Sequence, residues 1–296
     1  MTTDLGKRRQ EDEALNREIR RSPTDITMRL NRLIITAAIV VLFGFGGLTG
    51  FAQPIPPAGK QWVTVPALTD DFHAFDSAKW LPHHPGWEGR PPSVFDTNNV
   101  SFTNGMMLLQ MTLAETNQQG NWMHAACLAS RTRAFTVGMY AETRVKIANL
   151  CASTAFWMQG NYSEIDVIEN FGTAKNSAFN QLPTTMMSCT HYFPHGWSTD
   201  VAAARQTPNP NQQRNADRYF TYGVWWRDAR TVIFYRDGVA VGQVTTGGDF
   251  NEPMYLFFDM EPMSWGPGLP NATEVADSQR NTACFQWVHA WVLENR

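Results

Sequence analysis

The sequence predicts an all-β protein, built as an antiparallel sandwich or barrel. Short runs of strand-forming residues recur from Trp62 to the C-terminus, turn dipeptides lie beside them, and helical periodicity is almost absent. Many short strands without intervening amphipathic helices are typical of this class. The predicted strands are residues 106–113, 139–147, 153–158, 219–226, 231–236, 254–260 and 284–293.

Turn signals separate these strands. Asn104-Gly105 precedes the first run and Asp237-Gly238 follows the fifth, and both dipeptides are typical of tight hairpins. Residues 194–217 are rich in Asn, Gln and Pro and carry no strand signal. We expect a long loop there, either ordered at a functional rim or mobile. The strands together predict one sandwich of about 240 residues.

The N-terminal region has the character of a targeting segment. Residues 33–48 form a continuous apolar run preceded by Arg29 and Arg32, and small residues precede a cleavage position after Ala52. Residues 1–52 are therefore expected to be an N-terminal extension and signal peptide. Cleavage there predicts a secreted protein, extracellular or periplasmic.

Two features of this region leave alternatives open. Translation from Met28 would give a signal peptide of ordinary length, and residues 33–52 could instead remain as an uncleaved membrane anchor. Membrane association is expected only in that second case. The Pro-rich residues 53–61 predict a linker, and residues 62–296 the main domain.

The charge balance argues against a nucleic-acid partner. The chain has a formal net charge of −3, and outside residues 1–52 it carries 16 basic and 21 acidic residues. A weakly acidic domain in a chain with 11 tryptophans suits a neutral or polar ligand better than a polyanion. Nothing in the sequence implies a protein partner.

Four cysteines follow the N-terminal segment: Cys127, Cys151, Cys189 and Cys284. Their spacings match no zinc-binding pattern, and an exported chain can oxidise them. One or two disulfide bonds are therefore predicted. The sequence does not choose among the three possible pairings.

The stretch SEIDVIENFG, from position 163, places three carboxylates within six residues of an apolar run. On a strand Glu164 and Asp166 share one face, whereas strict alternation would turn Glu169 toward the apolar face. A one-residue β-bulge at Val167-Ile168 would bury both apolar side chains and return Glu169 to the acidic face. The pattern therefore predicts three carboxylates in a row on a bulged strand.

Such a row suits acid–base chemistry. Mutual repulsion raises the pKa of at least one carboxyl, so one group stays protonated while another is ionised. That is the acid-and-nucleophile pair of a retaining glycosidase, whose carboxyl groups lie about 5–5.5 Å apart. The alternatives are a solvated acidic face on an edge strand and a calcium site.

The motif E-I-D-V-I-E, with Phe156-Trp157 upstream and Asn170-Phe171-Gly172 downstream, resembles the signature of family 16 glycoside hydrolases. Its bulged form is similar to that of the family's agarases, porphyranases, κ-carrageenases and laminarinases. The segments DDFHAFDSAKW, FTYGVWW and TVIFYRDG resemble further landmarks of the family. The resemblance therefore extends over nearly all of the main domain.

This resemblance implies a jelly-roll sandwich of two curved antiparallel sheets with a concave substrate cleft, and residues 62–296 as its catalytic domain. It implies that Glu164 is the nucleophile, Asp166 the assisting carboxylate and Glu169 the general acid/base. No cofactor is implied. Many members bind a structural calcium ion, but Gln286 replaces the Asp expected in the closing strand, so no metal is predicted.

Substrate contacts are expected from residues outside the catalytic strand. Trp87 and Arg90 resemble the W-x-G-R-x-P loop of agarases and porphyranases, although an Arg stacked on a Trp is also ordinary surface packing. Trp157 is expected near the scissile bond, or else in the core. The last candidates are His191, Glu261 and Trp265, which resemble cleft residues of the agarase branch.

The substrate expected from these residues is an agar-type galactan, agarose or porphyran, cleaved internally at β-1,4 links. Arg90 does not separate the two, since a guanidinium group binds a sulfate as well as a hydroxyl. A κ-carrageenase or a laminarinase is the alternative within the family. A non-catalytic carbohydrate-binding sandwich is the alternative from another class.

Overall fold

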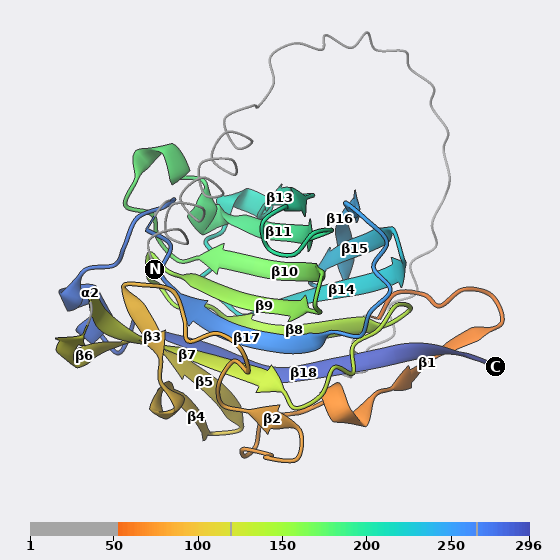
Figure 1. Cartoon of the computed structure of the whole chain (residues 1–296), viewed down its shortest axis with the longest axis horizontal. Helices are drawn as coiled ribbons and strands as arrows, with labels where there is room; N and C mark the ends of the chain where they lie inside the picture. Colours follow the sequence, from red (N-terminus) through yellow and green to blue (C-terminus); the bar gives the residue numbers. More distant parts are fainter. Residues whose placement is uncertain (1–52, 119, 265) are drawn as a thin grey trace, which may run out of the picture. The chain divides into compact units, whose positions relative to one another are not determined.

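The computed structural model describes residues 53–118, 120–264 and 266–296 as two stacked β-sheets (Figure 1). The predictions for residues 1–52 and for Trp265 fall outside these ranges. The predicted all-β sandwich of two antiparallel sheets is confirmed, with one parallel strand pair, β3–β7. A single α-helix, α2 (Ala272–Ala276), lies in the described part of the chain.

The first sheet has eight strands. In spatial order they are β16 (Val239–Thr245), β15 (Thr231–Arg236), β14 (Phe220–Asp228), β8 (Tyr140–Lys146), β18 (Thr282–Asn295), β5 (Met106–Gln110) and β4 (Val100–Thr103), with β1 (Lys60–Thr64) also paired to β18.

The second sheet has ten strands. They are β12 (Val201–Ala202), β11 (Thr185–Tyr192), β10 (Ser163–Phe171), β9 (Ser153–Gln159), β17 (Tyr255–Glu261), β7 (Asn121–Ser130) and β2 (Trp80–Leu81), with β13 (Arg205–Pro208) on β11 and both β3 (Ser93–Phe95) and β6 (Thr112–Gln118) on β7.

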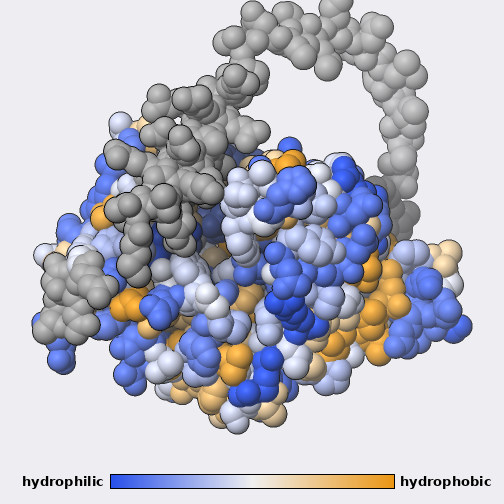
Figure 2. All heavy atoms as spheres, viewed as in Figure 1, coloured by the Kyte–Doolittle hydropathy of each residue, from blue (hydrophilic) through white to orange (hydrophobic). Residues whose placement is uncertain are grey.

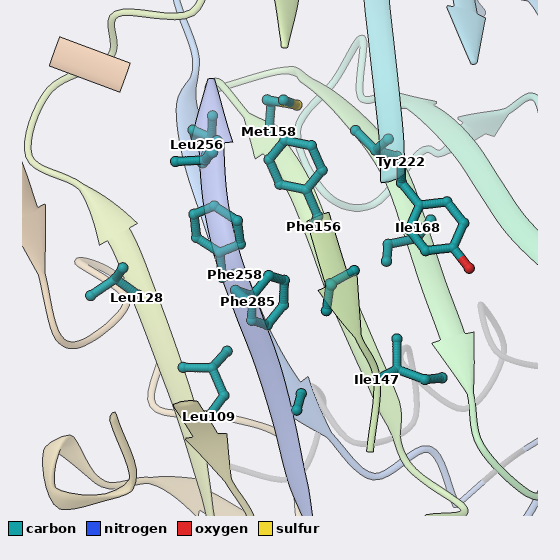
Figure 3. Packing of buried hydrophobic residues seen from close by; sticks show 14 of the residues in the cluster. Leu109, Leu128, Ile147, Phe156, Met158, Ile168, Tyr222, Leu256, Phe258 and Phe285 are labelled. Carbon is teal, nitrogen blue, oxygen red and sulfur yellow. The ribbon is translucent and has the colours of Figure 1, made fainter. Parts of the chain in front are cut away.

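Buried apolar side chains from both sheets form the core (Figure 3). Phe156 on β9 stacks on Phe258 of β17, with ring centroids 5.2 Å apart. Phe258 in turn meets the edge of Phe285, on β18 of the other sheet, at 5.1 Å. Since neighbouring residues of a strand point to opposite faces, residues flanking Phe156 and Phe258 lie on the outer face of the ten-stranded sheet.

Both predicted hairpin dipeptides are confirmed. Asn104 and Gly105 join β4 to β5, Asp237 and Gly238 join β15 to β16, and all four have positive φ angles. Positive φ at both central residues is the requirement of a tight type I′ turn.

Two expectations about unstructured segments need correction. The stretch 194–217 contains β12 and β13, which pair with β11 through their backbones. β1 begins at Lys60, within the range predicted as a linker. These short strands lie at sheet edges and carry polar residues, so their pairing leaves no apolar pattern in the sequence.

The predicted disulfide bonds are absent, since all four cysteines are free. Cys127 lies on β7, Cys189 on β11 and Cys284 on β18, and none is a cross-strand neighbour of another. Cys151 donates its thiol hydrogen to the carbonyl of Pro267 (3.2 Å). The expected export of the chain suggested pairing, but the fold leaves all four thiols free.

The central strand β10 is held by β11 in two different ways. From Ser163 to Asp166 the strands form an ordinary antiparallel ladder. Beyond it, the Ser188 hydroxyl donates to the carbonyl of Val167 (2.8 Å), and the Met187 N–H donates to the Asn170 side chain (2.9 Å). Side chains thus replace the backbone ladder where the two strands diverge.

Asn215 closes the gap between the diverging strands. Its fully buried amide nitrogen donates to the carbonyls of Phe171 (3.3 Å), Leu182 (2.9 Å) and Thr185 (3.0 Å). Backbone carbonyls that would otherwise be buried without partners are satisfied in this way.

The face seen in Figure 2 is mostly polar, with apolar residues gathered in a few patches. Within the described ranges, no helix has the length and apolar character needed to span a membrane.

Candidate active site

Three carboxylates lie on the outer face of the ten-stranded sheet, as the strand pattern predicts. Glu164, Asp166 and Glu169 of β10 are paired across the ladder with residues 159, 157 and 155 of β9, which alternate and so share one face. The register shifts between Asp166 and Ile168, which confirms the predicted bulge. Val167 and Ile168 are fully buried, as expected.

The two glutamates of the row differ in their surroundings. Glu164 Oε2 accepts a hydrogen bond from Gln159 Nε2 (2.6 Å), which favours the ionised carboxylate. Burial and the charge of Asp166 nevertheless raise the pKa of Glu164 to about 8. Burial, Asp166 and then Glu261 raise the pKa of Glu169 well above its usual range.

This difference decides which of the two glutamates keeps its proton longer. Glu169 faces further carboxylates, whereas Glu164 has an amide donor, so the last proton of the pair resides on Glu169. As the pH rises, Glu164 therefore ionises before Glu169, and an ionised carboxylate then lies beside a protonated one. That combination can attack an electrophilic carbon and protonate a leaving oxygen in one step.

A carboxylate–imidazole–carboxylate chain lies beside the row. His191 of β11 places Nε2 at 3.2 Å from Asp166 Oδ2 and Nδ1 at 2.7 Å from Asp200 Oδ2. Burial disfavours the charged imidazole, but Cys189, Asp166 and Asp200 outweigh it and raise the pKa of His191 well above its usual range. The chain fixes the orientation of Asp166 between the two glutamates.

The predicted Trp–Arg loop reaches the same face. Arg90 Nε donates to Glu261 Oε2 of β17 at 2.8 Å, and the Arg90 guanidinium carbon lies 5.7 Å from the centre of the Trp87 ring. Arg90 is thus both stacked and ion-paired, and Glu261, 5% exposed, has its partner. This ion pair joins the loop to β17 near the carboxylate row, where the charge of Glu261 helps to raise the pKa of Glu169.

Trp157, expected near the scissile bond or else in the core, lies on the outer face of β9 and is nearly buried. Its indole N–H donates to Asp259 Oδ2 (2.9 Å), and its ring stacks on Phe257 with centroids 4.4 Å apart. His84 stacks on both rings. This packed group forms an aromatic floor beside the carboxylates.

A buried glutamate fixes the turn between β9 and β10. Glu252 accepts hydrogen bonds from the backbone N–H groups of Asn161 (2.6 Å) and Tyr162 (2.7 Å) and from the Ser163 hydroxyl (2.9 Å). A side chain at Gly160 would collide with this carboxylate, because an added Cβ would lie 2.2 Å from its carbon. The turn sets the position of Glu164, two residues beyond Tyr162.

Among the site residues that were missed from the sequence are Gln159, Asp200, Asp259 and Cys189. Gln159 could have been found, since a tight turn at Gly160 pairs it with Glu164. The others contact the site only through pairing of strands that are distant or edge-located, which no local pattern shows.

The convex-face position considered for calcium does not fit the ion. Gln286 Oε1 accepts a hydrogen bond from Arg144 Nε at 2.7 Å. Calcium prefers six to eight oxygen ligands with carboxylates among them, and a guanidinium group beside Gln286 repels a cation.

Glutamine at position 164 is expected to stabilise the protein at alkaline pH. Glu164 has a higher pKa in the folded chain than its ordinary value of 4.5. Its ionisation therefore lowers the free energy of unfolding as the pH rises from about 4.5 to about 8. Glu164→Gln should therefore raise the melting temperature by several degrees at about pH 9 and by little at about pH 4, since 1 kcal/mol corresponds to roughly 2–4 °C here. Thermal unfolding followed by circular dichroism measures this.

The exposed Glu115→Gln on β6 is the control, because its charge lies in water in both states. An equal gain in both variants, or a gain largest at acid pH, would contradict the partly buried, repelled state of Glu164.

Comparison with known proteins places this geometry in context. A family model described as "Beta-porphyranase A-D, GH16 domain" matches residues 62–293. β-Porphyranase E of Zobellia galactanivorans is 28% identical over 256 residues, covering 80% of this chain and 90% of the relative. β-Porphyranase B of Phocaeicola plebeius is 29% identical, covering 81% and 87%.

Solved structures show the same fold. The β-porphyranase BpGH16B from the gut bacterium Bacteroides plebeius superposes with a TM-score of 0.72 at 26% identity, covering 82% of this chain and 96% of that one. β-Agarase A in complex with oligoagarose gives a TM-score of 0.73 at 19% identity, covering 81% and 96%. These matches agree with the two-sheet sandwich described above.

Proposed function

Because the chain belongs to glycoside hydrolase family GH16, in the β-porphyranase group, we propose that it hydrolyses an agar-type galactan by an endo-acting, retaining mechanism at β-1,4 links. The carboxylate row on the bulged β10 carries the proposal, since it places on one face two carboxyl groups, of which Glu164 gives up its proton before Glu169. A carbohydrate-binding module has no use for such a pair.

In the first step of this mechanism Glu164 attacks the anomeric carbon and Glu169 gives its proton to the leaving oxygen. Asp166, held by His191, orients Glu164 and favours the proton on Glu169. In the second step Glu169, now ionised, takes a proton from water, and the water oxygen attacks the anomeric carbon of the glycosyl–enzyme. Glu164 leaves, and the product keeps its configuration.

Substrate would lie along the aromatic floor and the Trp–Arg loop. Trp87 offers an apolar face to the C–H surfaces of galactose units, and Arg90 and Glu261 offer a donor and an acceptor to their hydroxyls. The nearly buried Trp157 supports the floor through its stacking on Phe257 and His84. His191, next to Asp166, is placed to contact the sugar at the cleavage point.

Porphyran is the preferred galactan of this proposal, with agarose second. The family model and the two relatives described above carry the porphyranase name. The carboxylates around Glu169 and Glu261 would repel a sulfate there, so sulfated units would lie beyond this cluster. A regularly sulfated κ-carrageenan fits this acidic cleft poorly.

Export remains part of the proposal. The basic and apolar pattern of residues 29–52 supports a signal peptide, and a polysaccharide of this size is met outside the cell.

We expect release of reducing ends from porphyran or agarose, a rapid early fall in viscosity, and no release from κ-carrageenan or laminarin. Purified protein is incubated with the four polysaccharides, and Glu164→Gln serves as the control. An early viscosity drop identifies internal cleavage. If folded protein released no reducing ends from either galactan, the proposed substrate class would be wrong. If Glu164→Gln stayed active, the proposed catalytic site would be wrong.

A further inference from the structure

Three side chains with different donor atoms converge beside the general acid/base. The ligand atoms of Asp166, Cys189 and His191 all lie within 4.8 Å of one another. Asp166 faces Cys189 in the β10–β11 register, and His191 lies two residues further along β11, on the same face. Cysteine spacing along the chain gives no sign of this cluster, because its members come from two strands.

Their separations are close to those around a tetrahedral zinc ion. Two N or O ligands at about 2.1 Å from such an ion lie about 3.4 Å apart. His191 Nε2 and Asp166 Oδ2 are 3.2 Å apart. The sulfur and an N or O ligand of such an ion lie about 3.6 Å apart, so Cys189 Sγ, within 4.8 Å of the other two ligand atoms, has to come closer to each of them by about 1.2 Å at most.

A second observation points to a ligand at this place. Asp166 is 4% exposed, yet its Oδ2 has no hydrogen-bond partner among the described residues. The contact with His191 Nε2 has the distance of an ion pair without the alignment of a hydrogen bond. A buried carboxylate oxygen without a hydrogen bond is costly, and this one lies next to a ligand atom of His191.

The surroundings of His191 match those of a metal-bound histidine. Its Nδ1 is held by Asp200 at 2.7 Å, so Nε2 is the nitrogen that faces Asp166. A carboxylate on the far nitrogen is the usual companion of a zinc-binding imidazole. Asp200 adds negative charge nearby, and so does Glu164 once it ionises, which attracts a divalent cation.

We propose that the catalytic cleft contains an inhibitory zinc site formed by Asp166, Cys189 and His191, with water as fourth ligand. Thiolate, imidazole and carboxylate together suit zinc and exclude calcium and magnesium, which take oxygen ligands. Binding releases the thiol proton and any proton on His191 Nε2 to solvent. Once Asp166 binds the ion, it no longer orients Glu164. The ion also places a double positive charge beside Glu169, so hydrolysis stops until the ion leaves.

Cobalt provides a test that needs no substrate. Chelator-treated wild-type protein titrated with Co²⁺ should develop a thiolate-to-cobalt charge-transfer band in the near ultraviolet. Cys189→Ala should lack the band, and Cys284→Ala, on the other sheet, should keep it. Cys189→Ser, which preserves the side-chain size, replaces the alanine variant if that one does not fold. Absence of the band from wild-type protein would overturn the site.

Zinc inhibition tests the consequence for catalysis, which rests on the proposed function. Zn²⁺ should inhibit the wild type and Cys284→Ala, reversibly with chelator, while Cys189→Ala needs at least about 10-fold more zinc relative to its own metal-free rate. Ca²⁺ and Mg²⁺ should have no effect. Equal zinc sensitivity in all three proteins, or a cobalt band without zinc inhibition, would overturn the inhibitory role. A protein inactive on every galactan would still give the cobalt result.

Discussion

Glu164→Gln should lower kcat on the galactan by at least about 10⁴-fold, while the protein stays folded. An amide has the shape of the carboxylate and can keep the hydrogen bond from Gln159, but it does not attack the anomeric carbon. The loss should appear in kcat and leave substrate binding nearly unchanged, because the substitution removes an interaction made only in the transition state. Reducing-end kinetics and calorimetric titration with an oligosaccharide measure the two quantities.

The exposed Glu115→Gln variant should keep the wild-type rate, since β6 takes no part in the carboxylate row. If Glu164→Gln kept more than about one hundredth of the activity, a nucleophile at this position would be excluded. Proton NMR of the first product offers an independent check, because an inverted anomeric configuration is incompatible with a covalent intermediate on Glu164.

Glu169→Gln should show a loss that depends on the leaving group. On the polysaccharide, whose leaving oxygen needs a proton, the rate should fall by about 10²–10⁴-fold. On an aryl glycoside with an acidic phenol the first step needs no proton, so the glycosyl–enzyme should form and accumulate, seen as a burst of phenol. Added azide should then restore turnover, because this anion attacks without help from a base.

Glu164→Gln is the matched comparison. This variant cannot form the glycosyl–enzyme, so azide should give no product with retained anomeric configuration. An equal loss on both substrates, with no rescue by azide, would show that Glu169 is not the acid/base. The contrast between the variants separates the two roles even where both abolish galactan hydrolysis.

Some features of the site could be predicted because they depend only on the order of residues within one strand. The order of Glu164, Val167, Ile168 and Glu169 allows only one arrangement that buries both apolar side chains, and the structure has that bulge. The hairpin dipeptides are equally local, since glycine and asparagine tolerate positive φ. Burial and backbone strain constrain such features without reference to the rest of the chain.

Other features depend on contacts between distant segments. Arg90 and Glu261 are 171 positions apart, and only the pairing of the loop with β17 brings them together. Asp200 precedes a two-residue edge strand whose pairing rests on backbone hydrogen bonds, which any polar sequence can make. The disulfide prediction was wrong for the same reason, because cysteine number says nothing about which strands the thiols occupy.

The two halves of β10 are held differently on the side of β11. Glu164 belongs to a segment clamped by backbone ladders on both sides, so it moves only when the sheet opens. Glu169 follows the bulge, where one side is held by Ser188, Asn170 and Asn215 side chains. The proposed nucleophile therefore has the more rigid frame. The proposed acid/base, which would serve first a leaving oxygen and then a water, lies on the half with fewer backbone hydrogen bonds to β11.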